Sequence, residues 1–266
     1  MTEPYCPNLK RLLAAAFLLI QLSTGMAFAG AGEIRSKHFV VKYNTTQEFA
    51  KKVLNRAEAE YERITKNLGY ARHDKYWTFE SRCTVYVHAN KESYLSARPG
   101  IPSWSSGYAD YSTRTISGYE GAEKFVPTIL PHEIAHLIFN DYVGRTSGIP
   151  KWFTEGVALA QEEGGRERFI QDVGKAIHQH YFIPIYLLSD EGFKGEHTYD
   201  FTNLSYAEAA LLLNFLLKQY GDDPFVQFCR KLREGMDFEK AFELAYRGSL
   251  ASPADLEAKF LENFQA

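Results

Sequence analysis

The stretch LPHEIAHLIF, residues 130–139, holds two histidines and a glutamate whose types and spacing could bind a metal ion. On an α-helix, residues four apart lie on one face, about 6 Å apart along the axis, so His132 and His136 can present two imidazole nitrogens to one ion. Glu133 lies about 100° round the helix from His132, where it can act as a base rather than as a ligand. A buried helix that happens to carry two histidines is the alternative, and a third ligand would decide between the two.

A candidate third ligand stands in a second motif, PKWFTEGVALA, which spans residues 150–160. A glutamate at an exposed helix end is commonly only solvated. Glu155, however, precedes Gly156 and a small apolar run, which indicates that its carboxylate points inward. Catalytic zinc takes three protein ligands and keeps one position open for water. Glu155 is therefore a candidate third ligand beside His132 and His136.

The two motifs together resemble the metal motifs of the gluzincin metallopeptidases. They are HEIAH and, after eighteen intervening residues, the glutamate of W-F-x-E-G-x-A. More specifically, the chain is similar to the peptidase MA-like domain family over roughly residues 39–264, although only the two metal motifs are specific. The resemblance implies an α+β, zincin-like (thermolysin-like) two-lobe catalytic domain with Zn²⁺ as its cofactor. It also implies His132, His136 and Glu155 as metal ligands and Glu133 as catalytic base.

The implied reaction is hydrolysis of a peptide bond by a zinc-bound water, with Glu133 taking the proton and passing it to the leaving amine. No G-A-M-E-N-like segment, with which zinc aminopeptidases bind a free amine, precedes HEIAH. This favours an endopeptidase. A hairpin expected at residues 107–119 could offer an edge for an extended peptide, or could be purely structural. The expected partner is a peptide or protein substrate.

Tyr206 resembles the tyrosine that opens the helix after the third ligand in such families, so its phenol could stabilise the oxyanion. An aromatic core residue is the alternative for Tyr206. His178, His180 or His197 could also serve as the donor.

One position departs from the thermolysin pattern. Leu159 stands four residues after the third ligand, where that pattern has an acidic residue. The group that orients a histidine ligand is therefore left unassigned, with Asn140, Asp141 and a backbone carbonyl as candidates.

Hydrophobic periodicity predicts a mixed α/β N-lobe over about residues 33–141 and a helical C-lobe over about 150–266. In the N-lobe we expect strands at 39–43 and 83–88, a helix at 47–68, a hairpin at 107–119 and the signature helix near 127–141. In the C-lobe we expect helices over Tyr206–Tyr220 and from Asp223-Pro224 and Ser252-Pro253, with the aspartate and the serine as caps.

The first 29 residues have the pattern of a secretory signal peptide. Lys10 and Arg11 precede an apolar run from Leu12 to Ile20, and residues 27–29, Ala-Phe-Ala, fit a cleavage site. The run is well short of the roughly 20 apolar residues that span a bilayer, and a retained anchor is the alternative. Cleavage would leave a peptidase domain over residues 30–266 that is periplasmic or secreted, with no stable membrane insertion.

The composition is that of a globular domain, with 45% hydrophobic and 24% charged residues in a chain of 266. A net charge of −3 and the lack of a dense basic run argue against nucleic acid as a partner. Cys83 and Cys229 would remain after cleavage and could form a disulfide or stay as buried thiols. The sequence does not determine the oligomeric state.

Three functions fit these residues. The first is an exported zinc metallopeptidase. The second is a non-catalytic, zinc-containing binding or assembly protein of the same fold, against which the intact Glu133 argues. The third is an amidase that acts on cell-wall peptides with the same residues.

Overall fold

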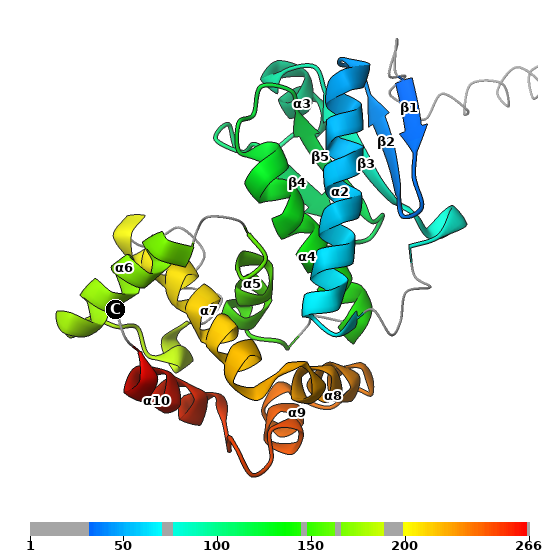
Figure 1. The fold of residues 1–266 in the computed structure, drawn as a ribbon. Helices are drawn as coiled ribbons and strands as arrows, with labels where there is room; N and C mark the ends of the chain where they lie inside the picture. The colour runs from blue at the N-terminus through cyan, green and yellow to red at the C-terminus, as the bar shows by residue number, and fades with distance from the viewer. Residues whose placement is uncertain (1–31, 71–76, 145–147, 163–165, 189–198, 265–266) are drawn as a thin grey trace, which may run out of the picture.

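The computed structural model describes residues 32–70, 77–144, 148–162, 166–188 and 199–264. The predicted signal peptide lies outside these residues, as does His197. The described residues form a five-stranded sheet with its helices, followed by a part made of helices (Figure 1). The predicted α+β class is therefore confirmed. None of the helices within the described ranges is long and apolar enough to cross a membrane.

The sheet has the strand order β1 (Gly32–Arg35), β2 (Phe39–Tyr43), β3 (Cys83–His88), β5 (Thr115–Tyr119), β4 (Gly107–Asp110). The strands predicted at 39–43 and 83–88 and the hairpin at 107–119 are confirmed. The ladders β2–β3 and β3–β5 are parallel, and β4 runs antiparallel to β5. The register sets Val41, Val85 and Ile116 side by side, all fully buried. This arrangement leaves β4 at an edge of the sheet.

Two helices pack against the sheet and against each other, α2 (Gln47–Asn67) on β1 and β2, and α4 (Leu130–Val143) on β4 and β5. The Thr46 side chain caps α2 by accepting a hydrogen bond from the backbone N–H of Phe49. The predicted apolar stripe of α2 is buried, from Val53 through Tyr61 to Ile64. The short helix α3 (Lys91–Ala97) contacts β3 and β5.

The signature helix begins later than the predicted residue 127. A π-helical turn over Phe125–Ile129 leads into α4, and Pro131 is the second residue of α4. Phe125 packs directly on the backbone of β5, because a Cβ at Gly118 would lie only 2.1 Å from its ring. The turn therefore fixes the start of α4 against β5.

The helical part is arranged around α7 (Tyr199–Tyr220), which contacts α5, α6 and α10 (Figure 1). The other helices are α5 (Lys151–Leu159), α6 (Arg166–His178), α8 (Asp222–Arg233), α9 (Phe238–Ala245) and α10 (Pro253–Asn263). The predicted Ser252 cap of α10 is confirmed, since its side chain accepts from the N–H of Asp255.

Two predicted helix starts were wrong. Tyr206 does not open a helix but is the eighth residue of α7, because the helix extends through the more polar residues before it and buries Leu204. Asp223 does not cap α8, which begins at Asp222 after Gly221. Gly221 has φ of +80°, a conformation that ends one helix and starts the next without a side-chain cap.

The two cysteines lie in different elements, Cys83 in β3 and Cys229 in α8. Both are buried and free. Burial raises the pKa of each thiol, so both thiols stay protonated at neutral pH.

Gly156 sets the distance between α5 and α7. A Cβ at this position would lie 2.6 Å from the carbonyl oxygen of Ala209 and 3.3 Å from the Cβ of Leu213. A backbone oxygen cannot shift without distorting α7.

We expect Gly156→Ala to lower the free energy of unfolding by about 1–3 kcal/mol, despite a helix propensity gain of about 1 kcal/mol, and Gly156→Ser to lower it further. Urea unfolding measures this, and a Gly156→Ala protein as stable as the parent would contradict the close approach.

Candidate metal centre

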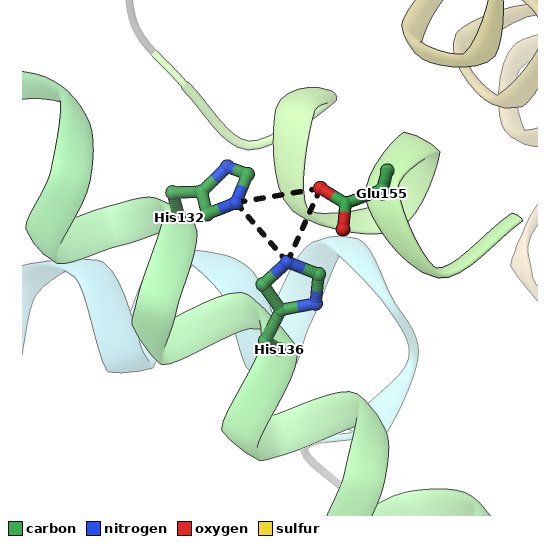
Figure 2. A group of neighbouring side chains, drawn as sticks. All are labelled: His132, His136 and Glu155. Carbon is green, nitrogen blue, oxygen red and sulfur yellow. Dashed lines mark hydrogen bonds and ion pairs between the residues drawn. The ribbon is translucent and has the colours of Figure 1, made fainter. Parts of the chain in front are cut away.

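The three predicted ligands converge between α4 and α5. His132 and His136 lie one turn apart on the same face of α4, and Glu155 points toward them from α5 (Figure 2). The His132 Nε2 and His136 Nε2 atoms are 3.0 Å apart. The Glu155 Oε2 atom lies 3.7 Å from the first and 3.6 Å from the second. The three ligand atoms therefore form a small triangle whose centre all of them can reach.

This triangle fits a zinc ion. Bonds of about 2.0–2.1 Å in a tetrahedral site place ligand atoms roughly 3.4 Å from one another, close to the three distances observed. Among the described residues the cluster has three members, the number of protein ligands typical of catalytic rather than structural zinc sites. The donor set of two imidazoles and one carboxylate also suits zinc.

Glu162 orients the first histidine. Its Oε1 atom lies 2.8 Å from His132 Nδ1, so Nδ1–H donates to the carboxylate and the Nε2 lone pair faces the other ligands. Sequence analysis left this role unassigned among Asn140, Asp141 and a backbone carbonyl; for His132 the structure shows Glu162 instead. Asp141 instead accepts hydrogen bonds from Trp77 and Arg114 at 2.6 and 3.0 Å, which ties the end of α4 to the N-lobe.

The neighbouring Gln161 is held by α2. It is buried, and its side-chain oxygen accepts from Asn67 Nδ2 at 3.1 Å and from Arg63 Nη1 at 3.3 Å. The Arg63 guanidinium also donates to the backbone carbonyl of Gln161. Because Glu162 is the next residue, this contact fixes the carboxylate that orients His132.

The charges at the cluster favour a bound cation. Burial alone would lower the pKa of His132, but the hydrogen bond to Glu162 and the neighbouring carboxylates outweigh burial and raise it. Burial would raise the pKa of Glu155, but the hydrogen bond from His136 and the surrounding positive charges lower it. Glu155 is therefore ionised at neutral pH and offers a charged ligand oxygen.

Two other predicted site residues, Glu133 and Tyr206, lie near this cluster. Glu133 is half-buried, and its charge contributes to the raised pKa of His132. Tyr206 is also half-buried; burial and the charge of Glu155 raise the pKa of its phenol to about 12, so its hydroxyl keeps its proton. The alternative donors His178 and His180 are exposed in and after α6.

Sequence analysis missed Tyr111. It follows β4 directly, and its ring centroid lies 6.1 Å from that of His136. Tyr111 keeps 49% of its surface exposed, and partial desolvation together with the charges of Glu133 and Glu155 raises the pKa of its phenol. The hairpin prediction located the turn that carries Tyr111, but only the folded chain shows that the turn reaches the cluster.

The role of Glu162 can be tested by metal affinity. Glu162→Gln keeps an acceptor for His132 but removes its charge, so we expect zinc affinity to fall about 10-fold, and up to about 100-fold in Glu162→Ala. Competition with a chromophoric chelator measures both values. Glu262→Gln, an exposed change on α10, is the control and should bind as the parent does. Unchanged affinity in Glu162→Ala would contradict the role.

Comparison with known proteins identifies the family. A search of curated proteins finds no significant match. A family model described as the Peptidase MA superfamily matches residues 73–262, which include His132, His136 and Glu155. Family membership implies a metallopeptidase, and the cluster supplies the metal ligands that such an enzyme needs. Because the match covers well over half of its residues, the chain belongs to the Peptidase MA superfamily.

Proposed function

We propose that this protein is an exported, zinc-dependent endopeptidase. The observation that carries the proposal is the convergence of His132, His136 and Glu155, whose ligand atoms all lie within 4.8 Å of one another. Glu133 stands beside this cluster on the same helix. A purely structural metal site has no use for that carboxylate, whereas hydrolysis requires a base at this place.

The residues divide the work of hydrolysis. When bound, zinc supplies a Lewis acid that polarises the substrate carbonyl and lowers the pKa of water towards roughly 7. The Glu133 carboxylate takes a proton from the attacking water and passes it to the nitrogen as the carbon–nitrogen bond breaks. Glu162 keeps His132 in the tautomer whose Nε2 can bind the metal.

In this mechanism a phenol near the cluster stabilises the carbonyl oxygen as it becomes negative. Tyr206 keeps its proton and lies close enough to the cluster for the charge of Glu155 to act on it. A neutral donor in a partly buried site stabilises a developing charge more than water does. We assign this role to Tyr206, with Tyr111 as the comparison residue on the opposite lobe.

The edge strand β4 supports an endopeptidase. One side of β4 pairs with β5, and the strand lies at the edge of the sheet and contacts α4. An extended peptide can add to such an edge through backbone hydrogen bonds. Tyr111 directly follows β4, and its ring lies beside that of His136, so the end of this edge strand is close to the cluster. A substrate paired with β4 would extend past the cluster in both directions, as internal cleavage requires.

Export is supported by the N-terminal sequence alone. Residues 1–29 combine the basic Lys10 and Arg11, the apolar run and the Ala-Phe-Ala end of a signal peptide. They lie outside the described residues.

The base is tested by Glu133→Gln. We expect this variant to retain about one zinc per chain but to cleave unfolded protein at least about 100-fold more slowly, because proton transfer is lost. Elemental mass spectrometry and a peptide cleavage assay measure the two effects. Glu123→Gln, an exposed change before α4, is the control and should cleave normally.

The outcome also separates the alternatives. Cleavage at the parent rate in Glu133→Gln would remove Glu133 from the mechanism. Zinc-loaded parent protein that turns over cell-wall peptides but not unfolded protein would favour the amidase. Zinc binding without any turnover would favour the non-catalytic binding protein.

The oxyanion donor is tested by two matched variants. We expect Tyr206→Phe to lower kcat about 100-fold with zinc retained, because one donor to the developing charge is removed. Tyr111→Phe should have a smaller effect. The larger loss in Tyr111→Phe, with Tyr206→Phe near the parent rate, would transfer the role to the residue after β4.

A further inference from the structure

Glu162, which orients His132, lies beyond the end of α5. It comes three residues after Leu159, the last residue of that helix, and its backbone N–H donates to the carbonyl of Leu159 at 3.1 Å. A residue outside a helix or strand has more conformational freedom to lose than one inside it. The carboxylate can therefore orient His132 only if other contacts fix the turn that carries it.

The peptide group between Gln161 and Glu162 is bonded at both ends. Its N–H, from Glu162, donates to Leu159. Its carbonyl, from Gln161, accepts from the Arg63 guanidinium. Because a peptide group is planar, bonds at its two ends fix the orientation of the whole plane. The buried Gln161 side chain adds bonds from Arg63 Nη1 at 3.3 Å and from Asn67 Nδ2 at 3.1 Å. α2 therefore sets the backbone direction from which the Glu162 side chain departs.

A buried ion pair holds Arg63 in turn. Glu60 is only 3% exposed, and its Oε2 atom accepts from Arg63 Nε at 2.8 Å and from Nη2 at 2.5 Å. Its Oε1 atom lies 2.7 Å from Nη2 of Arg56. Burying a carboxylate costs free energy unless such partners compensate it. Two bonds to one edge of the planar guanidinium fix the direction of the Arg63 fork, so that its other N–H groups reach Gln161.

We infer that Arg63 is a positioning residue for the metal centre, with Glu60 as the group that orients it. Arg63 fixes the peptide between Gln161 and Glu162. Glu162 then holds His132. The inference rests on the metal centre of the proposed function but not on peptide hydrolysis. It makes the affinity for the ion depend on α2, although α2 supplies no ligand to the cluster found among the described residues.

The sign of the effect separates this role from a simple effect of charge. Arg63 is a cation, so its removal would strengthen the binding of another cation if charge alone mattered. If Arg63 instead holds Glu162 in place, its removal leaves the Nδ1–H of His132 without a fixed acceptor and weakens metal binding. The two roles therefore predict opposite changes in zinc affinity.

The first experiment measures zinc affinity by competition with a chromophoric chelator. We expect Arg63→Met to lose about 10-fold, the lower end of the range for groups that support a metal ligand. This variant should fold, because Glu60 keeps its ion pair with Arg56. Arg63→Lys keeps a charge for Glu60 but lacks the planar fork, so its affinity should be intermediate. Asn67→Ala removes a single bond to Gln161 and gives a second, milder test, with a loss of the same sign.

A double-mutant cycle tests the route through Glu162. If Arg63 acts through that carboxylate, Arg63→Met should lose little further affinity in a protein that already carries Glu162→Ala. An equal loss in both backgrounds would show that Arg63 acts by another route, and would overturn the inference.

The matched control is Arg82→Met. Arg82 also donates to backbone carbonyls, at 2.8 Å to Ser36 and at 3.0 Å to Phe79, but it lies directly before β3. Its removal should lower the thermal stability and leave the zinc affinity unchanged. NMR of the zinc-free protein with labelled histidines adds a readout that stability alone does not change. The proton on His132 Nδ1 should exchange with water faster in Arg63→Met and at the parent rate in Arg82→Met.

The outcomes distinguish this inference from the proposed peptidase. Parent-like or tighter zinc binding by folded Arg63→Met would overturn the positioning role and leave the peptidase standing. No cleavage of any peptide by the zinc-loaded parent would overturn the peptidase. A loss of affinity in Arg63→Met that disappears in the Glu162→Ala background would still support the positioning role in that case.

Discussion

The imidazole of His136 and the carboxylates of Glu155 and Glu162 each have an atom within 4 Å of a ring nitrogen of His132. The surrounding protein must hold these four side chains in place. Fixing each side chain costs conformational entropy, and burying a carboxylate costs desolvation free energy. In the N-lobe, the burial of most residues of α4 against the sheet and α2 offsets this entropy cost for the two histidines. In the C-lobe, the packing of α5 on α7 offsets the same cost for Glu155, because Gly156 allows α5 to lie against the backbone of α7.

The same cluster has an electrostatic consequence for the whole fold. Three carboxylates, Glu133, Glu155 and Glu162, act on His132 and raise its pKa. A divalent cation bound by the histidines and Glu155 would neutralise much of this negative charge and connect α4 of one lobe to α5 of the other. Because an ion that binds only the folded chain stabilises it by mass action, zinc is expected to contribute to the stability of the protein as well as to its chemistry.

The sequence predicted those features that depend on local spacing. His132 and His136 share a helical face at any position in any fold, and the strands at 39–43 and 83–88 follow from alternation within each segment. Glu162 was missed because it lies after the end of α5, in a turn whose position depends on Arg63 and Asn67 of α2. Tyr111 and the start of α7 were missed for the same reason, since tertiary contacts place Tyr111 and bury Leu204, the sixth residue of α7.

The contacts of Gln161 join parts of the chain that are far apart in sequence. Arg63 and Gln161 are separated by 98 positions, and Glu162 is 30 positions from His132. An unfolded or half-synthesised chain therefore offers an ion little more than the local His132–His136 pair. The complete coordination set exists only after both lobes have formed, so tight metal capture is a late event. An ion that binds this cluster would then be acquired wherever the chain finishes folding, and the metal supply of that compartment would decide which cation occupies the cluster.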